Sequence, residues 1–113
     1  MDPYAFLPLS EASFYILLSL SSEAKHGYAI WKDVESLSNG SLKLSTSTLY
    51  DALERLLQQG LINRVKEESQ RNRGRPRKMY MLNEIGKQVL VMDLNRMRRL
   101  LELANPRLQD VPQ

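Results

Sequence analysis

Apolar residues recur along this chain at helical spacing, in stretches separated by short polar breaks. The clearest stretch has four leucines at i, i+4, i+7 and i+8, which share one helical face: Leu49, Leu53, Leu56 and Leu57. Ser45 precedes them with a hydroxyl that can cap the first turn, and Gly60 can adopt the left-handed conformation common after a helix end. The pattern therefore predicts a helix from Ser45 to Gly60 with one buried face.

The opposite face of this helix is polar, and its first turn is rich in hydroxyl side chains. At about 100° per residue, the exposed positions are Ser47, Asp51, Glu54, Arg55 and Gln58, with Thr48 and Tyr50 on the flanks. A solvated amphipathic helix would have the same pattern. The helix alone therefore does not distinguish a solvated surface from a binding surface, and the segment after Gly60 is needed to do so.

That segment predicts a β-hairpin with a basic tip. Residues 61–66 and 79–82 are apolar or alternating runs, and the turn between them is expected near Gly74. Five of the eight residues from 71 to 78 are cationic and none is acidic: Arg71, Arg73, Arg75, Arg77 and Lys78. The chain has a net charge of +3, so the remaining residues together carry −2. The positive charge is thus concentrated in the hairpin, which favours contact with the phosphates of a nucleic acid.

Two further helices are expected before Ser45. The first begins at the cap Ser10, with Leu9 and Phe14 as a hydrophobic staple, and is apolar nearly all round, which indicates a core helix. The second ends at Asn39 and Gly40 and carries its apolar stripe on Ile30, Val34 and Leu37. Its short connection to Ser45 is typical of a helix-turn-helix. Trp31 lies beside the stripe, and we expect it to be a core or interface residue rather than part of a ligand cage.

A long last helix is expected after Asn83, which can cap it. One apolar stripe follows steps of 4, 3, 4 and 3, the spacing of a coiled-coil seam: Leu90, Leu94, Met97, Leu101 and Ala104. A second stripe comprises Ile85, Val89, Met92, Leu100 and Leu103. Two stripes need two partners, which are most simply the helix's own domain and the same helix in a second copy.

Composition places the chain among single globular domains. Its 113 residues, 42% of them hydrophobic, suffice for one core, and the absence of cysteine fits a reducing cytoplasm. The seven-residue apolar run from Phe14 to Leu20 is too short for a spanning helix or a signal peptide. We expect a mainly α fold with a small β-hairpin, divided into a DNA-binding domain over 1–82, a dimerisation helix over 83–105 and a flexible tail over 106–113. Met1 to Pro8 reads as a loosely held arm.

The sequence argues against an enzyme. Its only histidine, His26, lies beside Gly27 at a helix start, where a histidine more often makes a turn hydrogen bond than acts as a catalytic base. No spacing of metal ligands and no phosphate-binding glycine loop appears. Cofactors are therefore not expected.

Several short motifs, in order and with matching spacing, resemble the PadR family of bacterial transcriptional regulators, in its short form with a single C-terminal helix. The resemblance covers about residues 9–103. The motifs are His26-Gly27-Tyr28, Ser45 with Thr48-Leu49-Tyr50, the run from Leu53 to Ile62, Gly74 to Tyr80, and Asn83-Glu84-Ile85-Gly86. Asp51 departs from the family, which often has proline there.

This resemblance implies a winged helix-turn-helix homodimer that binds an inverted-repeat operator, usually as a repressor. It implies DNA contacts from Tyr28, Ser45, Thr46, Ser47, Thr48, Tyr50, Arg73, Arg75, Arg77 and Lys78. The coiled-coil stripe would form the dimer interface, with room for a small-molecule effector there. The last helix has no aromatic residue from Glu84 to Ala104, which argues against an aromatic ligand sandwich built from it alone. The alternative is a dimeric winged-helix module that binds a protein partner, which the acids Asp51 and Glu54 keep open.

Overall fold

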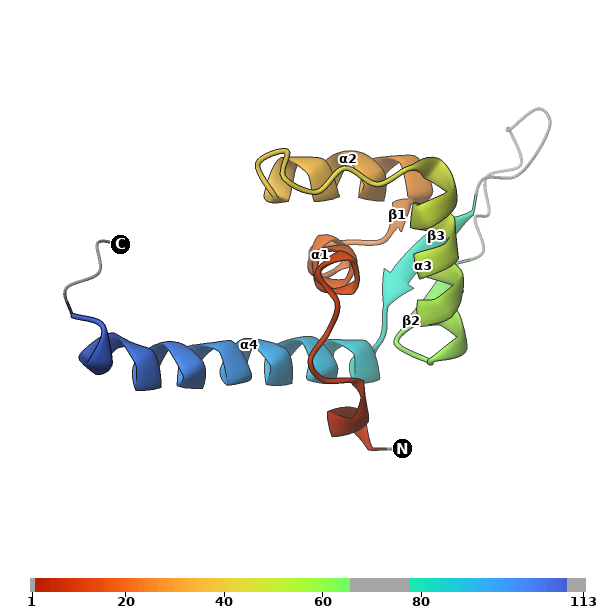
Figure 1. Ribbon diagram of the computed structural model, residues 1–113. Helices are drawn as coiled ribbons and strands as arrows, with labels where there is room; N and C mark the ends of the chain where they lie inside the picture. The colour runs from red at the N-terminus through yellow and green to blue at the C-terminus, as the bar shows by residue number, and fades with distance from the viewer. Residues whose placement is uncertain (1, 66–77, 110–113) are drawn as a thin grey trace, which may run out of the picture.

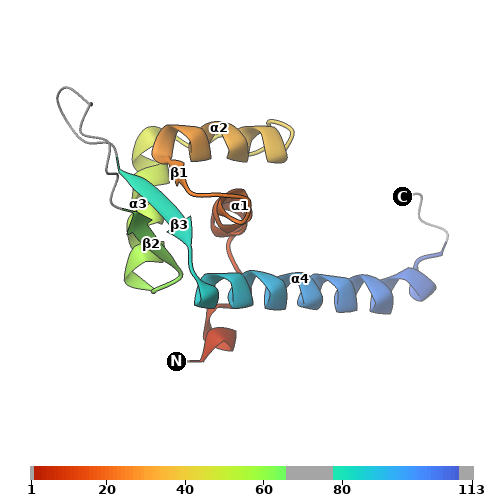
Figure 2. The ribbon, with the colours of Figure 1, turned by 180° about the vertical axis from the view of Figure 1, so that it is seen from behind.

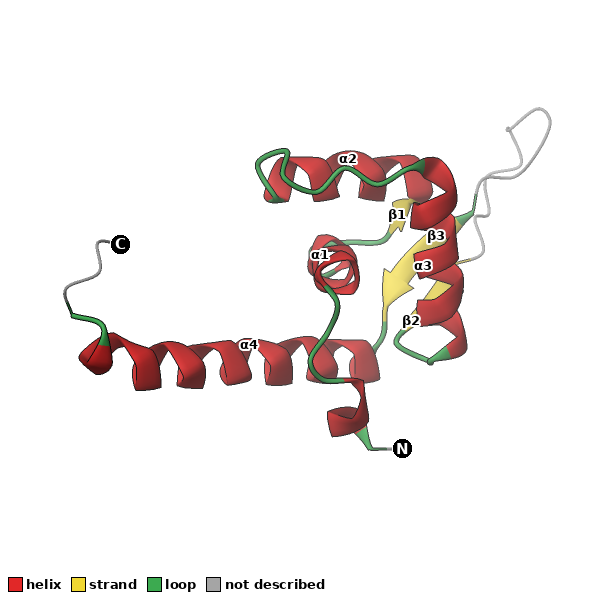
Figure 3. Cartoon of the chain, viewed as in Figure 1, coloured by secondary structure: helices red, strands yellow, loops and turns green. Residues whose placement is uncertain are grey.

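The computed structural model describes residues 2–65 and 78–109. These residues form a mainly helical domain with a small antiparallel sheet (Figures 1 and 3). The elements in order are η1 (Pro3–Phe6), α1 (Glu11–Leu20), β1 (Lys25–His26), α2 (Gly27–Leu37), α3 (Thr46–Gln58), β2 (Ile62–Val65), β3 (Met79–Leu82), α4 (Glu84–Ala104) and η2 (Asn105–Arg107). The expected fold class is confirmed.

Local sequence signals set where three of the helices begin. Ser10, Ser45 and Asn83 are the N-caps of α1, α3 and α4, and each side chain accepts a hydrogen bond from the backbone N–H three residues later. These bonds satisfy N–H groups that have no partner within the helix. Gly60 follows α3 with a φ of 78°, a conformation that glycine adopts without strain.

The sheet has one strand more than the expected hairpin. Its order is β1-β3-β2, with both pairs antiparallel, so β3 lies in the middle. Lys25 pairs with Tyr80 and His26 with Met79, which joins the entrance of α2 to the root of the hairpin. Residues 41–44, which connect α2 to α3, form no strand.

The core lies where α1, α2, α3, the sheet and the first turns of α4 meet. Figure 2 shows α1 between α2 and α4, and α1 contacts both of them as well as α3 and β3. This explains why α1 is apolar nearly all round: Ile16, Leu17 and Leu20 are each at most 3% exposed. The core thus holds α2 and α3 in a fixed relation to the sheet.

Helix α4 divides into a packed half and a protruding half. Near its start, Gly86 lies so close to the backbone carbonyl of Leu61 that a side chain would collide with it, and Val89, Leu90 and Asp93 are buried. The rest of the helix extends away from the domain (Figure 1). It carries a series of large apolar side chains that are 38–58% exposed: Leu94, Met97, Leu100, Leu101 and Leu103.

The segment before α1 is not a loose arm, as the sequence suggested. Asp2 caps a short helix whose residues contact α4, and Phe6, Leu7 and Leu9 pack against the core. Its apolar residues are too few and too irregular to reveal this packing by periodicity. At the other end, Asn105–Arg107 continues α4 as a single 3-10 turn.

Candidate nucleic-acid interface

The exposed start of α3 presents a compact group of hydroxyl side chains. Ser45 Oγ accepts the backbone N–H of Thr48 at 3.1 Å, lies 2.8 Å from Thr48 Oγ1, to which it donates, and lies 3.3 Å from Ser47 Oγ. Thr46 and Ser47 are exposed beside them. The cap therefore holds the hydroxyls in place while leaving them open to solvent.

The connection from α2 to α3 is pinned by side-chain hydrogen bonds. Trp31 Nε1 donates to the carbonyl of Leu44 at 2.7 Å, and Ser38 Oγ accepts the backbone N–H of Leu42 at 3.0 Å. Leu42 and Leu44 also pack against the core. The angle at which α3 leaves the connection is therefore fixed by contacts that residue spacing alone does not reveal. Trp31 is a structural residue, as expected, although it is only partly buried.

Tyrosines from both helices flank the start of α3. Tyr28 is 66% exposed, and its ring stacks on Trp31 at a centroid distance of 5.9 Å. Tyr50 is 42% exposed, and its hydroxyl lies against Gly27, where a Cβ would displace it. Gly27 and the two tyrosines, Tyr28 and Tyr50, thus belong to one packing arrangement at the surface.

Strand β2 lies beside α3, and an ion pair joins the two elements. Arg64 Nη2 on β2 is 3.8 Å from Glu54 Oε1 on α3, and both side chains are about half exposed. Glu54 is therefore not an unopposed acid on the face that would meet DNA. Burial raises the pKa of the nearby Tyr80 hydroxyl, an effect that the charge of Arg64 partly offsets. Asp51 remains exposed on α3.

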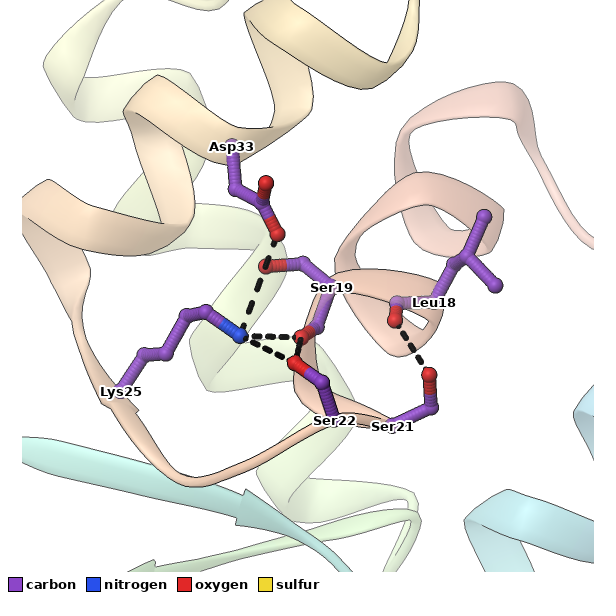
Figure 4. Close-up of polar contacts among 6 residues, drawn as sticks. All are labelled: Leu18, Ser19, Ser21, Ser22, Lys25 and Asp33. Atoms are coloured by element: carbon purple, nitrogen blue, oxygen red, sulfur yellow. Dashed lines mark hydrogen bonds and ion pairs between the residues drawn. The ribbon is translucent and has the colours of Figure 1, made fainter.

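A polar cluster around Lys25, which the residue pattern does not reveal, fixes the entrance to α2. Lys25 Nζ donates to the carbonyl of Ser19 at 2.5 Å and to Ser22 Oγ at 2.8 Å, and lies 3.9 Å from Asp33 Oδ2 (Figure 4). A cation at the carbonyl end of α1 is favourable for the helix dipole. The cluster joins α1, β1 and α2, and so helps to position Tyr28. A lysine shortly after a helix end was the signal in the sequence.

The residues assigned to the dimer seam do not all lie on one surface. Leu94, Met97 and Leu101 are exposed, and Ala104 is half-buried. Leu90, however, is only 4% exposed and belongs to the core of its own chain, so its assignment to the seam is wrong. The stripe of coiled-coil spacing begins inside the domain and emerges from it one turn later.

Arg96 forms an ion pair with a buried acid. Its Nε lies 2.7 Å from Oδ1 of Asp93, whose side chain is fully buried. The i, i+3 spacing is compatible with this ion pair, but the pattern of apolar residues did not predict that Asp93 is buried.

Of the expected hairpin contacts, only Lys78 lies within the described residues, and it is exposed where β3 begins. Arg73, Arg75 and Arg77 lie outside them, as does the expected turn at Gly74. The other expected contact residues are all exposed and lie on α3, at its N-cap and at the start of α2: Tyr28, Ser45, Thr46, Ser47, Thr48 and Tyr50.

A helix-turn-helix followed by a β-hairpin, with a third short strand on the sheet, defines the winged-helix class of domains. Within that class, the chain belongs to the PadR-like family of transcriptional regulators, because the model of that family matches residues 16–91. None of the curated proteins is similar enough to the chain to count as a match.

Solved structures of the same family share the fold. A PadR family transcription regulator from Clostridium difficile R20291 is 27% identical with a TM-score of 0.69, over 88% of this chain and 99% of that one. A PadR-like transcription factor from Bacteroides fragilis is 29% identical with a TM-score of 0.69, over 82% and 85%. Bacillus subtilis PadR, solved in complex with operator DNA, is 26% identical with a TM-score of 0.63, over 73% of this chain and 46% of that one.

Neither a membrane-spanning helix nor a cluster of metal ligands is present in the described ranges, 2–65 and 78–109. Within them, no helix is long and apolar enough to cross a membrane. They also contain no group of three or more histidine, cysteine or acidic residues that could hold a metal ion.

Proposed function

We propose that this chain is a sequence-specific transcriptional repressor that binds an inverted-repeat operator as a homodimer. The observation that carries the proposal is the rigidly held, hydroxyl-rich start of α3, which is exposed beside the root of a basic hairpin. Bacillus subtilis PadR, a longer relative, was solved with operator DNA, which supports the same class of ligand here. The cysteine-free sequence fits action in the cytoplasm.

In this proposal α3 enters the major groove with its first turn leading. Serine and threonine hydroxyls can donate to or accept from several base edges, while the positive end of the helix favours nearby phosphates. Ser45, Thr46, Ser47, Thr48 and Tyr50 would make these contacts. Tyr28, at the second position of α2, would reach the sugar-phosphate backbone.

The hairpin would supply the sequence-independent part of the affinity. Arg73, Arg75 and Arg77, together with Lys78, concentrate four cations in six residues. Arginine pairs well with phosphate oxygens and is attracted to a narrow minor groove. The ion pair between Arg64 and Glu54 reduces the repulsion that α3 would otherwise exert on DNA.

The exposed half of α4 would form the dimer. Leucine and methionine side chains with about half of their surface exposed are costly in water, and pairing with a second copy would bury them. A hollow of about 370 Å³ lies beside this surface, between η1 and α4, and is lined by Tyr4, Leu7, Met92, Asn95, Arg96 and Arg99. It is the place where an effector near the dimer seam would fit.

The proposal is tested by selecting short duplexes from random DNA and measuring affinity across a salt series. We expect a palindrome whose half-sites are about one helical turn apart. We also expect affinity to fall by roughly three to five decades between about 50 and about 200 mM salt, if about six to ten phosphates are neutralised. If no sequence is enriched and binding is weak at every salt concentration, the alternative of a protein-binding module replaces this proposal.

A triple variant separates the hairpin from the general positive charge of the chain. Changing Arg73, Arg75 and Arg77 to alanine should abolish DNA binding and leave the dimer intact. The matched control changes Arg98, Arg99 and Arg107 to alanine, which removes the same charge from exposed positions far along the chain. Wild-type DNA affinity in the hairpin variant would contradict the proposed hairpin contacts.

A further inference from the structure

A hollow of about 240 Å³ opens between α2 and α3, on the surface proposed to meet DNA. Its lining consists of Tyr28, Trp31, Thr46, Leu49 and Tyr50. Leu49 is 2% exposed and belongs to the core, whereas the rings of Tyr28 and Tyr50 are open to solvent. The hollow therefore has an apolar floor and aromatic walls, and it is separate from the hollow beside α4.

The walls of this hollow are preformed. Trp31 donates its only N–H to the carbonyl of Leu44, so the indole ring is held and offers only carbon surface to a ligand. The ring of Tyr28 stacks on it with an interplanar angle of 30°. Tyr50 is held from behind by Gly27, where no side chain could be accommodated without moving the tyrosine ring. A site whose walls need no rearrangement binds a ligand without the free-energy cost of ordering its side chains.

The chemistry of the lining selects the kind of ligand. None of its five residues is charged, and the ammonium of Lys32 lies 5.6 Å from the Tyr28 ring centroid without lining the hollow. A charged molecule would lose water there without gaining a counter-ion, which is unfavourable. Aromatic rings favour stacked or edge-on contact with another ring, and the Thr46 and tyrosine hydroxyls can satisfy one polar group.

The size of the hollow sets a second limit. Pockets for drug-sized ligands are typically about 300–1,000 Å³, and this one is smaller. It suits one aromatic ring or two fused rings. We infer that the hollow between α2 and α3 binds a neutral planar aromatic molecule of one or two rings, and that this molecule excludes DNA by covering Tyr28, Thr46 and Tyr50.

The exclusion of DNA rests on the proposed function, but ligand binding itself does not. Three of the five lining residues are proposed DNA contacts, so ligand and DNA would compete for the same surface. Such inhibition is direct and needs no change of conformation. It differs from an effector near the dimer seam, which would act on DNA binding from a distance.

Ligand binding is measured first without DNA, with 2-naphthol as the probe. The chain has one tryptophan, so its indole N–H gives a single resonance that reports on this hollow. We expect a saturable chemical-shift change of the Trp31 indole as 2-naphthol is added, and a much smaller change with the non-planar alcohol cyclohexanol. The absence of a saturable shift at Trp31, or shifts confined to Met92 and Asn95, would overturn the inference.

Two phenylalanine variants test the location. Thr46→Phe fills the hollow from an exposed position and should weaken 2-naphthol binding by about tenfold or more. Ser47→Phe is the matched control, because it adds the same side chain one residue later and outside the lining, and it should bind like the wild type. Equal affinities in the two variants would contradict binding in this hollow. The dispersion of the amide spectrum shows whether each variant is folded.

Competition is measured with the wild-type protein and the selected duplex. Each protomer of the proposed dimer carries one hollow, so the apparent dissociation constant for DNA should rise with the square of one plus the ratio of the 2-naphthol concentration to Ki, with Ki equal to the dissociation constant found by resonance. If 2-naphthol binds at Trp31 and DNA affinity does not change, the exclusion of DNA is refuted while the ligand site stands. If no duplex binds at all, the proposed function fails, and the resonance titration still decides the ligand site.

Discussion

Gly86 lies at the closest approach between α4 and the rest of the domain. A Cβ at this position would collide with the backbone carbonyl of Leu61 and would approach Leu82 Cδ1 to 2.8 Å. The leucine side chain can move, but the carbonyl belongs to the segment that leads into β2 and cannot. The residue thus sets the distance at which α4 packs, and with it the direction in which the exposed half of the helix leaves the domain.

We expect Gly86→Ala to destabilise the fold by about 2 kcal/mol, within the usual cost of forcing extra atoms into a packed contact. Urea unfolding of the two proteins measures the difference. Gln88→Ala, at an exposed position of the same helix, should change stability by less than about 0.5 kcal/mol. A Gly86→Ala protein as stable as the control would mean that α4 packs less closely than described.

Tyr80 links stability to alkaline pH. Burial raises the pKa of its hydroxyl in the folded state above the ordinary value of 10.0. Below pH 10 both states keep the proton and the stability is complete; above it the unfolded state loses its proton first. Stability should therefore fall as pH rises through the folded pKa, by up to about 1.4 kcal/mol per pH unit from this group.

Tyr80→Phe should remove this part of the alkaline loss, as measured by denaturant unfolding between pH 8 and 11. Tyr4→Phe is the control, since Tyr4 is 69% exposed, and its stability profile should follow the wild type. Parallel profiles for wild type and Tyr80→Phe would argue against a buried hydroxyl at this position.

At the scale of the elements, local signals predicted the helices and long-range contacts escaped prediction. The starts of α1, α3 and α4 were predicted because a capping residue and the helical spacing of apolar residues can both be recognised within a few residues of sequence. Strand β1 was missed because its two residues pair with β3, far along the chain. The polar cluster around Lys25 and the ion pair between Arg96 and Asp93 were missed for the same reason. The residues that surround them belong to other elements, which are distant in the sequence.

The candidate site was likewise predicted only where the signals are local in the sequence. The hydroxyl side chains at the start of α3 were predicted, because capping and exposure follow from the sequence around Ser45. The hollow between Tyr28, Trp31 and Tyr50 was not, because it depends on the angle between two helices. The seam residue Leu90 was assigned wrongly because periodicity cannot tell at which turn a helix leaves its own domain.

Ser45→Ala tests the element that carries the proposed contacts. Loss of the cap should cost about 1 kcal/mol of stability and should weaken binding to the selected duplex, because the first turn of α3 is no longer fixed. Unfolding and DNA titrations measure the two effects. Ser36→Ala, exposed on α2, should leave both unchanged. Loss of stability with unaltered DNA affinity would show that the first turn is not read by DNA.

At the scale of the whole molecule, the shape is set by α4. The described residues extend 59 Å in their longest dimension and 22 Å in their shortest, because about half of this helix has left the domain. The leucine and methionine side chains exposed along this half are the surface that the proposed dimer would bury.

If the proposed dimer forms, replacing both Leu94 and Leu101 by glutamate should convert it to a folded monomer, since each buried charge costs at least about tenfold in affinity. Sedimentation velocity measures the change. Gln88→Glu adds a charge at an exposed position of α4 outside the stripe and should leave the dimer intact. A double variant that still sediments as a dimer would place the interface elsewhere.

Strand β1 also has a consequence for how the chain acquires its structure. His26 and Met79 pair across 53 positions of sequence, whereas the contacts within each helix are local. Contacts between distant positions close late, because the entropy of closing a long loop must be offset first. We therefore expect the helices to be populated early on the folding pathway and the entrance of α2 to be fixed in the last step. The proposed DNA surface, which includes Tyr28, would then be completed only when folding itself is complete.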